Sequence, residues 1–382
     1  MESIEESSKV TQLVSAKPAR PASEHPLYIG HDWYDGIVEK LVDVVGDHMV
    51  AVVIDEEVAR LYPERLTTLK QTLPRVRVLS IKGGENAKTL DGFATVLHFL
   101  IENEVHRDDV LLSIGGGAII DLAGLAAGTY VRGLRWISLP TTFMSQFDSS
   151  VGGKNAINIS NNKNICGSFY EAAAVFVDTS FLDTLPNRFF RGGVSELTGL
   201  ALIDDEPLLA ELLEASGGGK GLAGIQTNLL NYMVRAINVK LKVYSSDPYQ
   251  QGLRMVLLTG HTTAHALEGA SRMHLYHGEA VAIGLAFESF IAERQGLIAS
   301  EDRKRLIDVL ENCQLPVALP AELHDHVIIE HIRLEKRNRG RMVSMVLPYS
   351  PGKAIDEWPG PHVMLSLDEL WDLLAAYRIA RG

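Results

Sequence analysis

Cysteine is scarce in this sequence, and long hydrophobic runs are absent. Cys166 and Cys313 are the only cysteines among 382 residues. Two thiols are too few for a disulfide scaffold and are typical of the reducing cytoplasm, where we expect the protein to be. No stretch of about 18 residues is apolar without a charge, which excludes a membrane-spanning helix. The first residues, MESIEESSKV, are acidic and lack an apolar core, so we expect no secretory signal.

Basic residues are also in short supply. Lysine and arginine number 36 against 48 aspartates and glutamates, which gives a formal net charge of −12 at pH 7. Proteins that bind nucleic acid normally show a basic excess or stripe, so that class is excluded. The negative field also repels anionic ligands. Any phosphate or carboxylate site must therefore be built from a local cluster of basic side chains.

The composition and length are those of a two-domain globular protein. Hydrophobic residues make up 46% and charged residues 22% of the chain. Residues 1–25 are rich in Glu, Ser, Pro and Ala without a period, which predicts a mobile tail. Residues 26–180 alternate between helical patterns and β-branched runs, and this predicts an α/β domain with a mostly parallel sheet covered on both faces. The predicted strands lie at 48–55, 75–81, 108–115 and 135–140, and the predicted helices at 61–73 and 90–104.

The pattern becomes mostly helical after residue 180, so we expect a second, helical domain over 181–382. The run at 341–349 predicts a late strand or hairpin arm. The glycine-rich segment 216–224 lacks the Gly-Lys-Ser/Thr ending of a phosphate-binding loop and predicts a loop between helices. The predicted helices of this part lie at 208–216, 227–244, 278–296, 300–313 and 368–379.

A glycine-rich turn follows the strand predicted at 108–115. Gly115, Gly116 and Gly117 let the backbone approach a ligand closely, and the next helix offers its N-terminal N–H groups to a phosphate. Ile120 replaces the third glycine of the dinucleotide fingerprint, so a plain strand-to-helix turn is the alternative. Asp55 ends an earlier strand, where an acid can hold a ribose hydroxyl.

Three of the 13 histidines lie within 17 residues. His261 and His265 are four residues apart and share a helix face, and His277 follows at the start of an apolar helix. Thr262 replaces the glutamate of zinc-protease motifs, which excludes that chemistry. Two imidazoles together with Glu196, at the start of another apolar helix, suit Zn²⁺ or Co²⁺ with an open position. Purely structural histidines are the alternative.

The segment 147–164 is polar and contains few bulky side chains, as surface loops do. It follows the strand predicted at 135–140, and parallel sheets bind ligands at the carboxyl ends of their strands. Arg132, just before that strand, adds a cation. The charged and amide side chains of the segment are Asp148, Lys154, Asn155, Asn158, Lys163 and Asn164.

Together these segments resemble the sugar-phosphate cyclase family, whose best-known member is 3-dehydroquinate synthase. The matches occur in family order over roughly residues 27 to 350. The resemblance implies a Rossmann-like N-terminal domain that binds NAD, a helical C-terminal domain that binds metal and substrate, and an active site between them. The matching stretches are GGENAKT, GGGAIIDLAGLAAGTYVRG, LPTTFMSQFDSSVGGKNAIN, KNICGSFY, DTLPNRFFRGGVSE, GHTTAHALE and YHGEAVAIG.

The resemblance also implies a role for individual residues. It makes Glu196, His261 and His277 the ligands of a Zn²⁺ or Co²⁺ ion. It implies a cytoplasmic homodimer in which Arg132 reaches the substrate phosphate of the neighbouring subunit. The implied NAD-binding residues are Asp55, Glu85, Lys88, Gly115, Gly116, Gly117, Asp121, Thr141 and Thr142. The implied substrate-contacting residues are Asp148, Lys154, Asn164, Lys240, Arg254, His265 and Lys336.

The implied reaction uses NAD⁺ transiently, eliminates phosphate from a sugar phosphate and closes a carbocycle by aldol addition. Gly199 and Leu258 stand where dehydroquinate synthases have a substrate-binding lysine and an asparagine. Lys240 and Arg254, which hold a substrate carboxylate in those enzymes, are retained. We therefore expect a phosphate-eliminating lyase acting on a seven-carbon keto-acid sugar phosphate, in a primary or a specialised pathway.

Three alternatives remain open. A cyclase of the valiolone or deoxy-inosose synthase type would act on a neutral sugar phosphate. A metal-dependent polyol dehydrogenase would share the architecture, but it needs no phosphate clamp such as Lys154, Asn164 and Arg132. A homologue without activity would only bind a ligand or partner, and retention of all three implied metal ligands argues against it. We expect no nucleic-acid or membrane partner.

Overall fold

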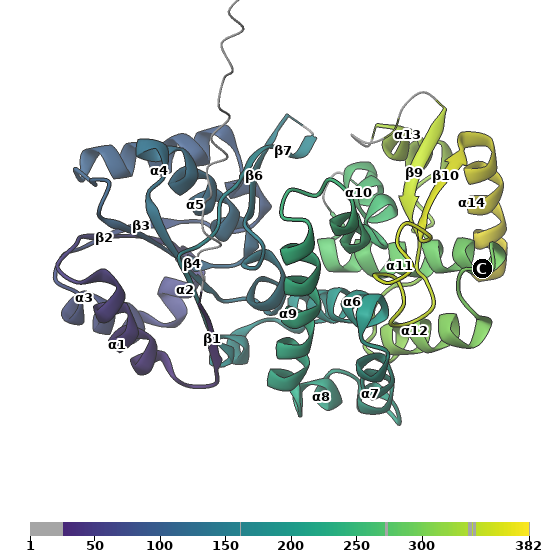
Figure 1. Ribbon diagram of the computed structural model, residues 1–382, viewed down its shortest axis with the longest axis horizontal. Helices are drawn as coiled ribbons and strands as arrows, with labels where there is room; N and C mark the ends of the chain where they lie inside the picture. The colour runs from purple at the N-terminus through teal and green to yellow at the C-terminus, as the bar shows by residue number, and fades with distance from the viewer. Residues whose placement is uncertain (1–25, 161, 272–273, 335–337, 339–340, 382) are drawn as a thin grey trace, which may run out of the picture.

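The computed structural model describes residues 26–160, 162–271, 274–334, 338 and 341–381. The tail predicted at 1–25 and the implied substrate residue Lys336 lie outside these residues. The molecule is elongated, with a sheet-containing half and a helical half side by side (Figure 1). Within the described ranges, none of the helices is long and apolar enough to cross a membrane.

A six-stranded parallel sheet forms the first half. Its order is β1-β8-β5-β4-β2-β3, and every neighbouring pair is parallel. Four of the strands confirm the predictions at 48–55, 75–81, 108–115 and 135–140. The strands are β1 (Leu27–Gly30), β2 (Val50–Asp55), β3 (Val76–Ile81), β4 (Val110–Gly115), β5 (Arg135–Pro140) and β8 (Ala174–Asp178).

Helices cover both faces of this sheet because its strands are apolar on both sides. Val50 and Val52 of β2 pack in one core cluster with α1 and α3, whereas Ala51 and Val53 pack in the other with α4 and α5. The predicted α/β architecture is thereby confirmed. The helices of this half are α1 (Tyr34–Val45), α2 (Glu56–Leu61), α3 (Pro63–Thr72), α4 (Leu90–Glu102) and α5 (Gly117–Thr129).

The polar segment 147–164, expected as a loop, is largely structured. The helical turn η3 (Ser145–Ser149) leads into the antiparallel hairpin of β6 (Lys154–Ile159) and β7 (Asn162–Phe169). Asn155 and Ile157 alternate with Lys154 and are buried. The Asn155 side-chain amide donates to the carbonyl of Tyr170 at 2.7 Å. A polar strand is stable here because one of its faces is covered and its buried amide has a partner.

The second half is mostly helical, as predicted, and includes an antiparallel pair of strands. The strand β9 confirms the run at 341–349. The glycine-rich segment 216–224 is only partly a loop, because α8 begins within it. The elements are α6 (Asn187–Asp204), α7 (Glu206–Ser216), α8 (Gly221–Gln226), α9 (Leu229–Ser246), α10 (His261–Ala270), α11 (His277–Arg294), α12 (Ser300–Asn312), α13 (Asp325–Arg333), β9 (Met342–Val346), β10 (His362–Ser366) and α14 (Leu367–Arg381).

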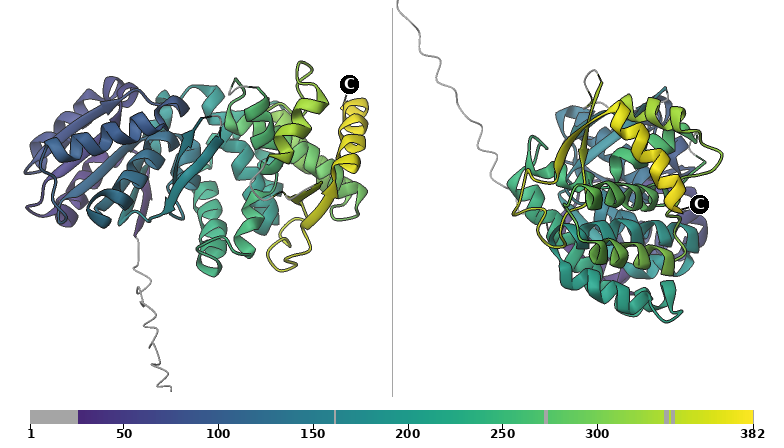
Figure 2. Two further views of the ribbon diagram at one scale, coloured as in Figure 1. Left: turned by 90° about the horizontal axis from the view of Figure 1, so that it is seen from above. Right: turned by 90° about the vertical axis from the view of Figure 1, so that its right-hand side faces the viewer.

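One hydrophobic core runs through both halves, which lie side by side in the left view of Figure 2. Phe143, just after β5, stacks on Phe190 of α6 with ring centroids 4.6 Å apart. Gly193 makes room for this contact, since a Cβ there would lie 2.3 Å from Phe143 Cδ1. Strand β8 ends at Asp178 and α6 begins at Asn187, on either side of the boundary predicted near residue 180. The division into two domains stays a prediction.

Candidate active site

Three helices of the second half bring Glu196, His261 and His277 together. Glu196 lies in the middle of α6, not at its start as expected, and the two histidines open α10 and α11. One ligand atom from each residue lies within 4.8 Å of the others. Glu196 Oε1 is 3.3 Å from His261 Nε2 and 3.2 Å from His277 Nε2. The arrangement has the donor set of a divalent-metal site.

Glycines allow these helices to approach at backbone distance. A Cβ on Gly278 of α11 would lie 2.1 Å from the Cα of Gly192 in α6. A Cβ on Gly284 of α11 would lie 2.0 Å from the carbonyl oxygen of Gly260, the residue before α10. Larger side chains at either crossing would push α6 or α10 away from α11. The glycines therefore set the spacing of the three ligand-bearing helices.

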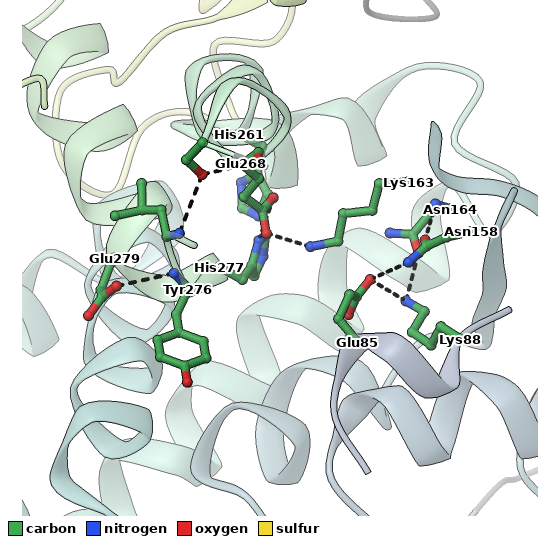
Figure 3. Close-up of polar contacts among 12 residues, drawn as sticks. Glu85, Lys88, Asn158, Lys163, Asn164, His261, Glu268, Tyr276, His277 and Glu279 are labelled. Carbon is green, nitrogen blue, oxygen red and sulfur yellow. Dashed lines mark hydrogen bonds and ion pairs between the residues drawn. The ribbon is translucent and has the colours of Figure 1, made fainter. Parts of the chain in front are cut away.

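Each imidazole is oriented by a contact at its other nitrogen. His261 Nδ1 lies 3.1 Å from the carbonyl oxygen of Thr259. A carbonyl only accepts, so this nitrogen carries the proton and Nε2 is left with a lone pair for a metal. His277 Nδ1 lies 3.2 Å from Glu268 Oε2, and Glu268 Oε1 accepts from Lys163 Nζ at 2.5 Å (Figure 3). Such outer contacts are typical of metal-binding histidines.

The charges of the trio support a cation site. Burial opposes ionisation of Glu196, but the imidazoles of His261 and His277 outweigh it and hold the pKa of this carboxyl well below its usual range. Burial also opposes the charged form of His277, yet Glu268 and Glu196 raise the pKa of His277 to about 9. Glu196 Oε1 is buried and has no well-directed hydrogen bond within the described part of the chain. A divalent ion among the three would satisfy this oxygen, so the residues fit a metal.

A buried glutamate stabilises the start of α10. Glu288 of α11 is fully buried, and its two oxygens accept from the backbone N–H of Gly260 at 2.6 Å and of Thr263 at 2.9 Å. It thus acts as an N-cap supplied by another helix. Burial raises the pKa of Glu288 to about 7, against the lowering effect of these hydrogen bonds. The cap holds the backbone of His261 in place.

A cavity of about 1180 Å³ lies between the metal trio and the sheet. It has the size of a cofactor plus a small substrate. Of the residues that the resemblance implies for the site, Gly115 and Arg132 are the only ones in the described ranges that do not line it. The predicted residues that do are Asp55, Glu85, Lys88, Gly116, Gly117, Asp121, Thr141, Thr142, Asp148, Lys154, Asn164, Glu196, Lys240, Arg254, His261, His265 and His277.

The sheet contributes the carboxyl ends of adjacent strands to the cavity. Asp55 ends β2, and Gly116 and Gly117 follow β4 and start α5. Asp55 Oδ1 caps α2 by accepting from the N–H of Glu57 at 3.0 Å. Gly83 packs directly on this carboxyl, since a Cβ there would lie 1.9 Å from Asp55 Oδ2. The geometry is that of a nucleotide crevice in a doubly wound sheet.

The floor of this crevice is a chain of polar contacts. Lys88 Nζ donates to Asp121 Oδ2 at 2.6 Å and to Asn164 Oδ1 at 2.7 Å. Asn158 donates to Glu85 Oε1 at 2.8 Å. Through Lys88 these contacts join α5 to the hairpin β6–β7, and Figure 3 shows the part formed by Glu85, Lys88, Asn158 and Asn164. Residues that the sequence places in two separate motifs thus share one wall of the cavity.

Two buried cations also line the cavity. Lys240 of α9 is 7% exposed and binds the carboxylate and the carbonyl of Asp148. Arg254 is 1% exposed. Its terminal nitrogens donate to the carbonyls of Pro248 and Gly152, while its Nε has no partner in the described ranges. Burial lowers the pKa of Arg254, against nearby Asp148.

Three residues that make contacts in the site were not predicted as site residues from the sequence. Glu268 and Glu288 were not singled out, and Lys163 was noted only as one charge of a polar segment. Glu268 lies seven residues after His261 and so shares its helix face, a signal that would have found it. Glu288 gave none, because its partners on α10 are more than 20 residues away.

Arg132 lies apart from the cavity. It is exposed, in the short helical turn η2 (Tyr130–Arg132) after α5. Val131 and Arg132 have φ values of +45° and +62°, a conformation that non-glycine residues, above all β-branched ones, rarely adopt. The structure thus presents this arginine outward, away from the cavity of its own chain.

Comparison with known proteins connects this site to a family. Models for the N-terminal and C-terminal parts of 3-dehydroquinate synthase match residues 78–192 and 193–338. The 3-dehydroquinate synthase of Pseudoalteromonas translucida (strain TAC 125) is 35% identical over 331 residues, which cover 86% of this chain and 92% of the relative. That of Pseudomonas savastanoi pv. phaseolicola (strain 1448A / Race 6) is 36% identical over 340 residues, 88% and 91% of the two chains.

Solved structures show the same fold. The 2-epi-5-epi-valiolone synthase of Streptomyces hygroscopicus subsp. jinggangensis 5008, with NAD⁺ and Zn²⁺ bound, has a TM-score of 0.81 at 25% identity and covers 94% of this chain and 97% of its own. A 2-deoxy-scyllo-inosose synthase complexed with carbaglucose-6-phosphate, NAD⁺ and Co²⁺ has a TM-score of 0.79 at 24% identity, over 92% and 96%. From the matched family models and the relatives above 30% identity, we conclude that this chain belongs to the 3-dehydroquinate synthase family of sugar-phosphate cyclases.

Proposed function

We propose that this enzyme is an NAD- and divalent-metal-dependent lyase that eliminates phosphate from a seven-carbon keto-acid sugar phosphate and closes a carbocycle. The observation that carries the choice of substrate is the environment of Arg254. The Arg254 guanidinium is 1% exposed and bound to two backbone carbonyls, and among the described residues its Nε has no partner and no carboxylate lies within hydrogen-bond distance of it. Buried charges are normally paired, so a substrate carboxylate is the partner that this site calls for.

The residues present fit both cofactors. Glu196, His261 and His277 would hold Zn²⁺ or Co²⁺, and the ends of β2, β4 and β5 with Lys88 and Asp121 would hold NAD. Two structural neighbours with those ligands bound support this assignment. When bound, NAD⁺ supplies a hydride acceptor and the metal a Lewis acid that stabilises an alkoxide.

The chain's own side chains divide the remaining work. Lys154, Asn164 and His265 would bind the phosphate that leaves, and the positive charge of Lys154 locally offsets the net charge of −12. Lys240 and Arg254 would hold the carboxylate at the other end of the substrate. Asp148 accepts a hydrogen bond from Lys240 and thereby holds the ammonium group of that lysine in position.

The quaternary structure is also part of the proposal. We infer a cytoplasmic homodimer of chains with domains at 26–180 and 181–382, in which Arg132 serves the neighbouring site. An apolar groove next to Arg132 supports this. Ile101 and Val131 in this groove are 60% and 37% exposed. The groove is lined by Phe93, Leu97, Ile101, Thr129, Tyr130 and Val131.

A neutral sugar phosphate is the second candidate. Gly199 and Leu258 give the cavity wall near Glu196 an apolar character, and a Cβ on Gly199 would make only ordinary contacts with Leu285 at 3.7 Å. The wall thus lacks the two polar side chains that dehydroquinate synthases have at these positions, and each such contact is worth about 1–3 kcal/mol. Two solved structures of the same fold, a 2-epi-5-epi-valiolone synthase and a 2-deoxy-scyllo-inosose synthase, support this alternative.

Phosphate release from a panel of substrates tests the proposal. The enzyme is incubated with NAD⁺ and Zn²⁺ or Co²⁺, and with the keto-acid sugar phosphate, sedoheptulose 7-phosphate or glucose 6-phosphate. We expect turnover of the keto acid. The variant Arg254→Met should lower kcat/KM for it about 10- to 100-fold, which corresponds to a charged hydrogen bond of about 1.5–3 kcal/mol.

The exposed Arg333→Met is the matched control and should leave kcat/KM unchanged. Turnover of a neutral sugar phosphate, with no turnover of the keto-acid sugar phosphate, would contradict the choice of substrate. Net accumulation of NADH with a simple polyol would instead identify a dehydrogenase.

A further inference from the structure

The two halves of the molecule meet in an ion pair that touches the metal site. Lys163 of the hairpin strand β7 lies 2.5 Å from Glu268 Oε1 of α10, and the two side chains are 17% and 3% exposed. The second oxygen of Glu268 lies 3.2 Å from His277 Nδ1. Figure 3 shows Lys163 joined to Glu268 by a dashed line, with His277 next to Glu268. Neither Lys163 nor Glu268 belongs to the trio that would bind the metal.

An irregularity in the hairpin aims Lys163 at this point. Successive side chains of a regular strand point to opposite faces. The pairing of β6 with β7 shifts register between Ile157 and Ile159, and Asn164 has a φ of +51°. As a result Lys163 and Asn164, which are adjacent, both line the cavity. Bulges that redirect a side chain in this way are common next to active sites.

Glu268 determines which ring nitrogen of His277 carries the proton. Glu268 Oε1 accepts from Lys163 Nζ at 2.5 Å and Glu268 Oε2 lies 3.2 Å from His277 Nδ1, so the carboxylate is the acceptor on both sides. An ionised carboxylate accepts the proton of Nδ1, which leaves the Nε2 lone pair for the metal. Lys163 holds the other oxygen and thereby fixes the direction of the carboxylate.

We propose that Glu268 is a positioning residue for the metal ligand His277, and that Lys163 acts through Glu268 to tie the hairpin to the metal site. The proposal rests on the metal site of the proposed function. The same hairpin carries Lys154 and Asn164, which are assigned to the substrate phosphate. One contact chain thus joins the phosphate-binding side of the cavity to the outer shell of the metal.

Titration of the metal-free full-length protein with Co²⁺ tests the role of Glu268, with the visible absorption of the bound ion as the readout. The variant Glu268→Gln should bind Co²⁺ about 10- to 100-fold more weakly than the wild type, and the spectrum at saturation should change. The exposed Glu330→Gln is the matched control and should match the wild type in both. A merely structural role would lower the thermal stability of the metal-free protein and leave the saturated spectrum unaltered.

The role of Lys163 is tested by a double-mutant cycle. Lys163→Met should change Co²⁺ affinity in the wild-type background and have no effect in the Glu268→Gln background, because its influence passes through Glu268. Lys242→Met, which removes a lysine from a surface ion pair with Asp204, is the control for loss of positive charge. Lys163 is 17% exposed on a hairpin. The single variant Lys163→Met therefore still tests the contact chain through its Co²⁺ affinity if Glu268→Gln does not fold.

The outcomes separate this inference from the proposed function. A wild-type protein that bound no Co²⁺ would contradict the proposed metal site itself. Wild-type binding with unchanged affinity and spectrum in Glu268→Gln would overturn only the positioning role. Equal effects of Lys163→Met in both backgrounds, or no effect in either, would overturn the link to the hairpin.

Discussion

At the scale of single residues, His277 joins two carboxylates of different function. Its Nε2 faces the proposed ligand Glu196, and its Nδ1 faces Glu268. His277→Ala should abolish metal binding and turnover, because one of three protein ligands is lost. The fold should persist, since the imidazole lies on the cavity wall rather than in the hydrophobic core. Metal content after dialysis, phosphate release and circular dichroism measure the three effects.

The exposed His106→Ala provides the control for loss of an imidazole and should keep metal content and turnover. Exhaustive chelation of the wild type should reproduce the loss of turnover. Full activity in the chelated enzyme would refute the metal requirement.

At the scale of elements, α10 is held at both ends by carboxylates of the site. Glu288 of α11 caps its N-terminus, and Glu268 near its other end contacts His277. The crossing at Gly260 and Gly284 brings α11 close enough for the cap. The position of His261 therefore depends on packing between helices as much as on α10 itself.

Glu288 gives the fold a defined pH dependence. Burial raises the pKa of Glu288 from 4.5 to about 7, and His261 is the charged neighbour that opposes this shift. A raised carboxyl pKa stabilises the native state below pH 4.5, and this contribution is lost as the pH rises through about 7. In the wild type it should amount to roughly 3 kcal/mol, from about 1.4 kcal/mol per pKa unit.

The variant Glu288→Gln does not titrate and should lack this decline. It also loses one of two acceptors for the N-terminus of α10, which costs about 1 kcal/mol or more at every pH. We therefore expect the variant to be less stable than the wild type at pH 5 and to lose less stability between pH 5 and pH 8. Urea unfolding of both metal-free proteins at the two pH values measures this. Parallel pH profiles would contradict the prediction.

At the scale of the whole molecule, Arg132 is the one implied substrate residue of the described ranges that lies outside the cavity. This residue points outward beside the groove formed by α4 and η2, where Ile101 and Val131 are exposed. A second copy of the chain docked on this groove would bury the apolar residues and carry Arg132 to a neighbouring site. Ile101→Glu should then give a folded monomer with reduced activity, as measured by light scattering and phosphate release.

Complementation between two inactive variants tests the same arrangement more directly. Arg132→Ala lacks the donated arginine, and His277→Ala lacks a metal ligand. A mixed dimer would contain one complete site, so mixing equal amounts should restore about a quarter of the wild-type activity by random pairing. Each variant alone should remain inactive. Failure of a mixed, exchanged sample to regain activity would show that Arg132 does not act across a dimer.

The sequence by itself determined the α/β sheet, most of the second-half helices and the residue types of the site. Apolar runs such as that at 50–55 and helical spacing such as that at 90–102 are local signals, and the structure follows them. The turn after β4 and the clustered histidines were likewise legible, because their chemistry is carried by neighbours in sequence. The secondary structure of polar segments was predicted less accurately. The hairpin of β6 and β7 looked like a loop because one of its faces lines a cavity.

Only the tertiary structure decided which of these groups meet. Glu196 lies 65 residues from His261, yet the approach of α6 to α11 at Gly192 and Gly278 places its oxygen between two imidazoles. The ion pair of Lys163 with Glu268, the cap by Glu288 and the burial of Arg254 are also products of packing. Their physical reason is common to all of them. A buried charged group needs a polar or charged partner, and the fold supplies it from a residue far away in the sequence. The spacing of residues along the sequence does not show which residue that is.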